Sequence, residues 1–339
     1  MWVIGNRSYT RVLCSAYRIM TVTLNGVRLF FSSASFFSFS PHVFSKYSLV
    51  KSARRPAIAE RISISHAMWL TFGCFRLCSP SQWIVVFQVV DSQPGKCDDT
   101  FVYLPDIEQN AIVIYDYRKN DSWRIKHNYF HFEPTLTLFN IAGVRFHWED
   151  GVFGLALSKV NPDGYRTMYF HPLASSQEFM LSTRILQNRT LCDDPESFYD
   201  VELLGSKGPD SQASSSFLDP STGILYFTQL SKNGVACWNS VTNAKKFSPE
   251  TIALIAQDDK ELIFPNEVKV DSNGDLWVLS NRVPLFSFQK LDPSEINYRI
   301  FKTSAKSLYK GTVCDPEYKG WFIVYTHRFF LFYFLHLGH

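Results

Sequence analysis

Closely spaced histidines and acidic pairs are the residues of this chain that most resemble metal ligands. His127 and His131 stand four apart in "HNYFHF", and adjacent Asp pairs occur at 98–99 and 193–194. On a strand, residues i and i+4 share a face but lie about 13 Å apart, too far for one metal ion. Neighbouring acids on a strand point to opposite faces, so solvated loops are the default interpretation of both pairs. We therefore predict no metal site and no cofactor.

Motifs for nucleophilic or phosphate chemistry are also missing from the sequence. The chain has no Gly-x-Ser-x-Gly elbow, no phosphate-binding loop and no His-Glu-x-x-His motif. His147 is more interesting, since it precedes Trp148 and two acids, and the turn "DGVFG" (150–154) that follows begins a repeat. Loop residues there could face a central channel. No side chain qualifies as nucleophile or general base on sequence alone, so we leave catalytic residues unassigned.

A repeated hairpin would position these loops. "SSSFLDPSTGILYFTQL" (214–230) and "VKVDSNGDLWVLS" (268–280) each run from an apolar strand ending in Asp, through a turn, to a strand centred on an aromatic residue. Weaker copies occupy 89–106 and 154–173. Each copy leads into a further run that we expect to be β-rich: "NAIVIYDYR", "EFMLSTRIL", "GVACWNS" and "PLFSFQKL".

The spacing of the copies favours one all-β architecture. The equivalent aromatic residues Tyr103, Tyr169, Tyr226 and Trp277 are 66, 57 and 51 residues apart. Three-stranded units that repeat about every 50–60 residues are typical of β-propeller blades. A β-sandwich also repeats hairpins, but the aligned Asp–turn–aromatic register favours the propeller.

Charge is distributed unevenly along the chain. Residues 1–84 contain ten Lys/Arg and a single acid, Glu60, which leaves 24 basic and 30 acidic residues in 85–339. The body is therefore acidic, whereas a nucleic-acid reader needs a basic stripe on its folded part. We expect no nucleic-acid partner.

Both ends differ from the repeats. The front has a Phe/Ser-rich stretch at 29–48 without clean alternation, and it lacks the order of a secretory signal. The apolar tail "WFIVYTHRFFLFYFLHLGH" (321–339) is interrupted by His327, Arg328 and His336. A membrane span needs about 20 residues with few charges. We therefore expect no stable membrane anchor, and we expect both ends to lie outside the domain.

Motifs in the middle of the chain carry a family resemblance. They are "GKCDDTFVYLPDI", "SWRIKHNYFHFEP", "FHWEDGVFGLALS", "YRTMYFHPLASSQEFMLSTRILQN", "ELIFPNEVKVDSNGDLWVLSNRVP" and "LDPSEINYRIFKTS". In this order they resemble the insect yellow and major royal jelly protein family, from about Val85 to Cys314. The resemblance implies a secreted, extracellular, glycosylated six-bladed β-propeller that acts in cuticle and melanin pigmentation. Some members bind biogenic amines, and some are linked to dopachrome conversion.

The chain departs from the family pattern at both ends. A Cys-Gly-Arg-Leu-Trp-Val stretch is missing before Val85, and the closing segment of the family is missing after Cys314. Four repeats are recognisable where six are expected. We therefore predict a basic non-family segment at 1–84, an incomplete propeller of about four blades at 85–314, and an apolar non-family tail at 315–339.

Cysteines and sequons fit the secretion that the resemblance implies. We expect a disulfide between Cys237 and Cys314, because both lie in family-like contexts, and we expect Cys97 to have lost its partner with a missing blade. Sequons at Asn188 and Asn120 are the expected glycosylation sites in the body, with Asn188 preferred.

A ligand site is expected where the innermost strands of the propeller converge. "FPNEV" and "VLSNRVP" place Asn266 and Asn281 near opposite ends of adjacent strands, and the resemblance supports both as ligand-binding residues. Val283 matches a position that is more often a larger apolar residue. Asp150 and Phe153 are weaker candidates. The competing interpretation of each Asn is a turn residue that satisfies backbone groups.

Three functions remain open at this stage. The first is a secreted protein of pigmentation that binds catechol- or indole-type amines, or another small melanin precursor, without turnover. The second is an isomerase-like enzyme that converts dopachrome by a proton shift. The third is a structural or nutritive glycoprotein. We favour the first, because no general acid or base stands out.

Overall fold

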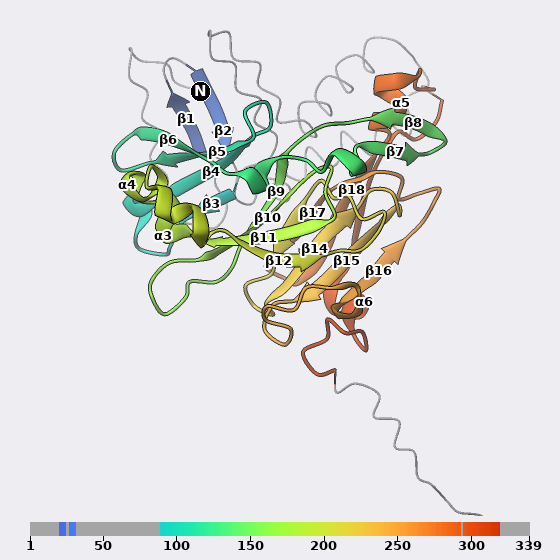
Figure 1. Ribbon diagram of the computed structural model, residues 1–339. Helices are drawn as coiled ribbons and strands as arrows, with labels where there is room; N and C mark the ends of the chain where they lie inside the picture. The colour runs from blue at the N-terminus through green and yellow to red at the C-terminus, as the bar shows by residue number, and fades with distance from the viewer. Residues whose placement is uncertain (1–19, 25–26, 32–88, 293, 319–339) are drawn as a thin grey trace, which may run out of the picture.

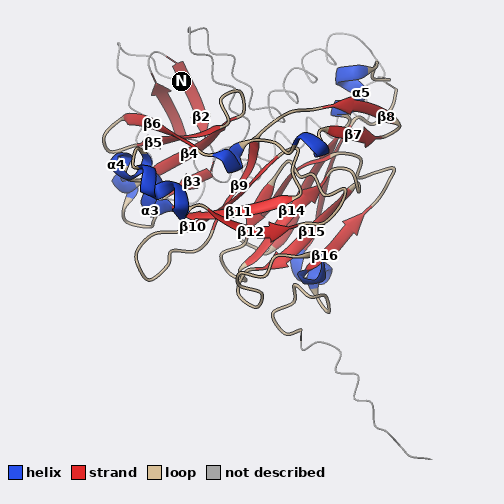
Figure 2. Ribbon diagram, viewed as in Figure 1, coloured by secondary structure: helices blue, strands red, loops and turns tan. Residues whose placement is uncertain are grey.

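The chain is seen here as a computed structural model, which describes residues 20–24, 27–31, 89–292 and 294–318 (Figure 1). Strands dominate these residues, and the helices are short (Figure 2). None of the helices in the described ranges is long and apolar enough to cross a membrane.

Four antiparallel sheets follow one another along the chain as blades of a β-propeller. Blade 1 holds β3 (Val89–Asp91), β4 (Phe101–Asp106), β5 (Ala111–Asp116) and β6 (Asp121–Lys126). Blade 2 holds β9 (Val152–Leu157), β10 (Thr167–Pro172), β11 (Gln177–Ser182) and β12 (Glu202–Ser206). Blade 3 holds β13 (Ser216–Leu218), β14 (Ile224–Gln229), β15 (Gly234–Asn239) and β16 (Ile252–Gln257). Blade 4 holds β17 (Pro265–Val270), β18 (Asp275–Asn281) and β19 (Tyr298–Ser304). The prediction of an all-β propeller with about four recognisable blades is confirmed.

Smaller elements connect or flank the blades. They are two hairpins, β1 (Met20–Leu24) with β2 (Val27–Phe31) and β7 (Leu138–Ile141) with β8 (Val144–His147), and the helices α3 (Thr183–Leu186), α4 (Arg189–Cys192), α5 (Val283–Phe288) and α6 (Ala305–Tyr309). Short 3-10 helices η1 (Cys97–Asp99), η2 (Asn128–Phe130), η3 (Pro134–Leu136), η4 (Pro195–Asp200) and η5 (Pro249–Thr251) fill several loops.

The Asp–turn–aromatic register has a direct physical cause in two blades. The hydroxyl of Tyr103 on β4 donates to Oδ2 of Asp91 at 3.2 Å, and Nε1 of Trp277 on β18 donates to Oδ2 of Asp271 at 2.9 Å. The Asp that ends the first strand thus accepts a hydrogen bond from the aromatic residue of the second. In blade 3, Asp219 instead accepts from the turn, including the backbone N–H of Ser221 at 2.9 Å.

Blades 2 and 3 each bury their two faces against the blades on either side. On β10, Met168 and Phe170 pack with blade 1, whereas Tyr169 between them packs with Leu225 and other residues of blade 3. Blade 3 packs on blade 4 in the same way, through Tyr226 and its neighbours. Alternation along a strand sends successive side chains to opposite faces, so one strand serves two interfaces.

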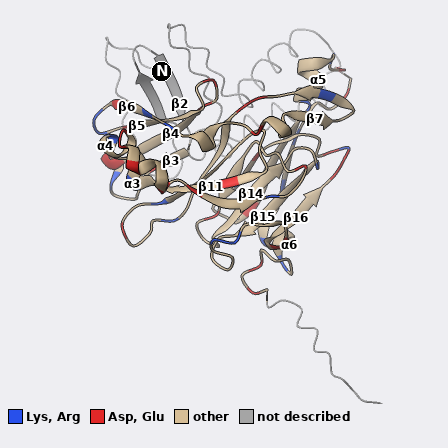
Figure 3. Ribbon diagram, in the orientation of Figure 1, with Lys and Arg blue, Asp and Glu red and all other residues tan. Residues whose placement is uncertain are grey.

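The first strand of each blade lies innermost. β13 packs against both β9 and β17, and β3 also packs against β9. Charged segments of both signs are interspersed over the blades (Figure 3). One ion pair spans blades 1 and 2, with Nε of Arg166 2.8 Å from Oδ1 of Asp91.

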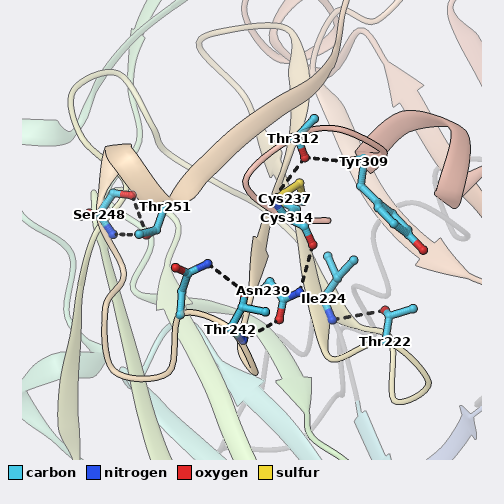
Figure 4. The surroundings of a disulfide bond; sticks show 11 residues. Thr222, Ile224, Cys237, Asn239, Thr242, Ser248, Thr251, Tyr309, Thr312 and Cys314 are labelled. Carbon is cyan, nitrogen blue, oxygen red and sulfur yellow. Dashed lines mark hydrogen bonds between the residues drawn. A yellow bond between two sulfur atoms is a disulfide. The ribbon is translucent and has the colours of Figure 1, made fainter. Parts of the chain in front are cut away.

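A disulfide joins blade 3 to the segment after blade 4, as predicted. Cys237 on β15 is bonded to Cys314, with an S–S distance of 2.04 Å (Figure 4). Nδ2 of Asn239 donates to the carbonyl of Cys314 at 3.0 Å beside it. The expectation that Cys97 lacks a partner is wrong, because Cys97 is disulfide-bonded. Cys192 has a free, half-buried thiol.

One predicted β-rich run is a helix. "PLFSFQKL" (284–291) mostly lies in α5, where Pro284 occupies the first turn and needs no hydrogen-bond partner for a backbone N–H. The third strand of blade 4 is instead β19, which pairs with β18 along its whole length.

Candidate functional site

The candidate site lies at the rim of the propeller where the innermost strands begin. β9 begins at Val152 and β17 at Pro265, and the antiparallel β18 ends at this rim with Asn281. The β7–β8 hairpin and α5 pack together at the same rim. The shared apolar core here, which we call the rim cluster, comprises Phe139, Ile141, Val144, Phe146, Phe153, Leu173, Ala174, Leu230, Phe264 and Val283.

Asp150 is a half-buried carboxylate two residues before the start of β9. Nε1 of Trp148 donates to its Oδ2 at 2.6 Å. Burial raises the pKa of Asp150 from 3.8 to about 6, and the hydrogen bond from Trp148 opposes this only in part. Removal from water disfavours the charged form of a carboxyl group. A cationic ligand beside Asp150 would favour the charged form again.

Aromatic side chains pack around Trp148, the hydrogen-bond partner of this carboxylate. The ring of Trp148 stacks on that of Phe264 with 6.1 Å between centroids and 6° between planes. Phe146 stacks on Phe139 at 5.4 Å and on Phe288 at 4.7 Å. Such faces carry a negative quadrupole that attracts cations and offers a flat surface to another ring.

Asn281 is buried at the same rim, with 1% of its surface exposed. The side-chain Oδ1 of Asn281 accepts a hydrogen bond from the backbone N–H of Val283 at 3.1 Å. The backbone N–H of Asn281 donates to the carbonyl of Phe264 at 3.3 Å. Its Nδ2 has no hydrogen-bond partner in the described part of the chain. Asn281 therefore satisfies backbone groups, as the competing interpretation expected, and retains an amide donor that no described residue uses.

Asn266 lies close by, at the irregularity in β17 between Pro265 and Glu267. It is 3% exposed, and its carbonyl accepts from the hydroxyl of Ser214 at 2.9 Å. Because Pro265 pairs with Ser280, the antiparallel strands bring Asn266 and Asn281 to one rim, although they stand near opposite ends of their strands.

The structure thus gathers the expected ligand-binding residues at one rim. Phe153 and Val283 both belong to the rim cluster, and Trp148, the partner of Asp150, packs against that cluster. Sequence reasoning did not assign Trp148 or Phe264 to the site, although both stand within the quoted motifs "FHWEDGVFG" and "IFPNE". An aromatic residue one or two positions from an expected ligand residue was the available signal.

The other candidates occupy ordinary structural positions. Nδ1 of His127 accepts from the backbone N–H of Tyr129 at 3.0 Å, capping η2, while His131 is exposed. The described residues contain no group of three metal-ligating side chains. Asn188 is exposed and caps α4, and the exposed Asn120 accepts from the hydroxyl of Tyr115 at 2.9 Å. Both sequons are thus open to the solvent.

Known proteins resemble this chain over about two-thirds of its length. L-dopachrome tautomerase yellow-f of Drosophila melanogaster is 35% identical over 226 residues, which cover 67% of this chain and 52% of that protein. Protein yellow of Drosophila melanogaster is 40% identical over 221 residues, covering 65% of this chain and 40% of that protein. The chain therefore spans about half the length, or less, of these relatives. A solved nidogen/laminin complex matches with a TM-score of only 0.38 at 15% identity, covering 58% of this chain and 57% of that one, and we draw nothing from it.

The family match covers all four blades. The family model described as major royal jelly protein matches residues 79–314, well over half of the chain. This range also contains the rim cluster and the Cys237–Cys314 disulfide. The chain belongs to the major royal jelly protein family.

Proposed function

We propose that this protein binds a catechol- or indole-type amine at the rim site and acts, outside the cell, in pigmentation. Asp150 carries the proposal, because its carboxylate is half-buried beside stacked aromatic rings and its pKa is raised to about 6. An ammonium group would restore the charged carboxylate, and the rings would pack on an aromatic ligand. The name of one relative, L-dopachrome tautomerase yellow-f, supports the proposed role in pigmentation.

Asn281 adds a second point of recognition. Its Nδ2 is a buried donor without a partner among the described residues, and buried donors are rarely left unpaired. An oxygen or ring of the ligand would accept from it. Asn266, Val283 and Phe153 complete the proposed binding surface, in which Val283 leaves more space than a larger apolar residue.

Titration calorimetry with dopamine on the full chain tests this proposal. We expect saturable binding that weakens at least about tenfold in Asn281→Leu, because a hydrogen bond to a buried group is lost. Asn120→Ala is the control, because Asn120 lies in the turn between β5 and β6 of blade 1, away from the rim site. We expect it to leave binding unchanged. Absence of saturable heat with dopamine, and with serotonin as an indole amine, would contradict the proposal and favour a structural or nutritive role.

Dopachrome conversion is the second candidate function. A carboxyl with a pKa of about 6 can both give and take protons near neutral pH, which suits a proton shift. The test follows the loss of dopachrome colour with the full chain and with Asp150→Asn. Acceleration that disappears in the variant supports turnover, whereas a rate equal to that of buffer leaves binding alone.

A further inference from the structure

A cluster of charged side chains is buried in blade 2 just below the rim. His171 on β10 and Glu178 on β11 are both 0% exposed, and Nδ1 of His171 lies 3.0 Å from Oε2 of Glu178. Lys207, which follows β12, donates to the same Oε2 at 3.2 Å and to the carbonyl of Gln177 at 2.6 Å. Burial lowers the pKa of His171, which favours the neutral ring. Lys207 and Glu178 form an ion pair of opposite charges, and the ring of His171 is neutral. The three side chains together therefore carry no net charge.

This group faces blade 3. Tyr169, two residues before His171, packs edge-on against Trp238 of blade 3 with 5.9 Å between ring centroids. Residues two apart on a strand share a face, so His171 points to the same interface. Gly154 on the innermost strand β9 is paired with His171, and a Cβ at Gly154 would lie 2.4 Å from Nε2 of the imidazole. The glycine therefore lets the ring reach the innermost strand.

Blade 3 contributes two polar side chains to this interface. Leu218 and Phe227 pack with Tyr169 across the two blades. Ser216 stands two residues before Leu218 and Gln229 two residues after Phe227, so alternation places both on the face that meets blade 2. Both lie toward the rim, because β13 begins there and β14 ends there.

Four polar atoms of this interface lack hydrogen-bond partners in the described part of the chain. They are Nε2 of His171, Oε1 of Glu178, Oγ of Ser216 and Nε2 of Gln229, and each residue is at most 2% exposed. We call this set the interface cluster. Buried polar atoms in folded proteins are nearly always hydrogen-bonded, so four in one interface indicate groups that a bound molecule satisfies.

The interface cluster continues into the rim site. His171 stands two residues before Leu173, Gln229 directly precedes Leu230, and Gly154 directly follows Phe153. Leu173, Leu230 and Phe153 all belong to the rim cluster. The interface cluster therefore adjoins the rim cluster along three segments of the chain.

We propose that the interface cluster binds the ring hydroxyl groups of a catechol whose ammonium group pairs with Asp150. The cluster offers both donors and acceptors: Gln229 donates, the unprotonated Nε2 of His171 and Oε1 of Glu178 accept, and Ser216 does either. Hydroxyl groups also donate and accept, and they are neutral, which suits a carboxylate of Glu178 that Lys207 already pairs. A carboxylate or phosphate would meet the acceptor atoms of His171 and Glu178 and gain no compensating charge. This inference rests on the proposed amine binding and narrows it to amines with ring hydroxyl groups.

Two probes that differ only in the ring hydroxyl groups test the proposal. Dopamine and phenethylamine share the ring and the ammonium chain, and we expect calorimetry to show dopamine binding at least about tenfold more tightly to the wild type, because a site built for a hydroxyl rejects the analogue that lacks it. Ser216→Ala should weaken dopamine about tenfold and leave phenethylamine unchanged. The melting temperature of the free variant should stay the same or rise, because a buried hydroxyl without a partner is removed.

Ser215→Ala is the matched control. Ser215 is buried next to Ser216, but its hydroxyl donates to Oε1 of Glu267 in blade 4 at 2.8 Å. This variant should melt at a lower temperature and keep the wild-type ratio of affinities. Equal affinity of the wild type for the two probes, or an unchanged ratio in Ser216→Ala, overturns the inference while amine binding stands. Binding of neither probe instead refutes the proposed function itself.

Discussion

Asp150 makes the affinity for an amine depend on pH. The ligand's ammonium pairs with the ionised carboxylate, and the pKa of Asp150 in the folded protein is about 6. About nine tenths of the carboxylate is ionised at pH 7 and about one tenth at pH 5. We therefore expect dopamine to bind about tenfold more weakly at pH 5 than at pH 7, while the ammonium group itself stays charged throughout.

The same pKa affects the stability of the free protein. Burial raises the pKa from 3.8 to about 6, so the folded state binds more protons than the unfolded state between these values. The contribution of Asp150 to the free energy of unfolding is therefore greatest below pH 4 and is lost as the pH rises through 6. The whole change corresponds to about 3 kcal/mol as an upper limit. Asp150→Asn should remove this dependence and raise the free energy of unfolding at pH 7 by up to about that amount.

Two assays check these magnitudes. Dopamine titrations at pH 5, 6 and 7 give the change in affinity, and urea unfolding of the wild type and Asp150→Asn at pH 3.5 and 7 gives the change in stability. Asn at this position can still accept the hydrogen bond from Trp148, so the comparison isolates the charge. An affinity that does not change with pH, together with a variant no more stable than the wild type at pH 7, would show that Asp150 is not the buried carboxylate described here.

Further predictions concern the blades that support the site. Cys237→Ser should lower the free energy of unfolding by about 4 kcal/mol, because the disulfide closes a loop with a sequence separation of 77, and urea unfolding with and without reductant checks this. Trp277→Phe removes the hydrogen bond to Asp271 and leaves a smaller aromatic ring, so we expect a loss of at least about 1 kcal/mol in the same assay, and no loss would mean that the bond adds nothing. Gly154→Ala places a Cβ against His171 and should lower the free energy of unfolding by about 1–3 kcal/mol. Gly164→Ala is the comparison: it lies in an exposed turn where the new Cβ meets no atom within 4 Å, so it should show only the strain of a positive φ.

The repeated fold was accessible from the sequence because its signals are local. The aromatic residues Tyr103, Tyr169, Tyr226 and Trp277 each stand on the second strand of a blade, as the hairpin register predicted. Short apolar runs are more ambiguous, and the run at 284–291 forms a helix because Pro284 suits a first helical turn.

The candidate site was only partly accessible. Asn266 and Asn281 came from the family resemblance, and the antiparallel pairing of their strands brings them to one rim. The group of His171, Glu178 and Lys207 was not predicted, because Lys207 and Glu178 are 29 residues apart in the sequence and β12 lies between them. Neither a motif nor a periodicity indicates such a contact. Alternation along β10 predicts the side of the strand on which His171 lies. Only the assembled blades show which residues of blade 3 lie opposite it.

A crystal structure of the protein soaked with dopamine would test the rim site most directly. We predict the ammonium group within hydrogen-bonding distance of Asp150, the ring near Trp148 and Phe264, and the hydroxyl groups directed between blades 2 and 3. Dopamine bound elsewhere on the propeller, with Asp150 and Asn281 untouched, would contradict the assignment of the rim as the ligand site.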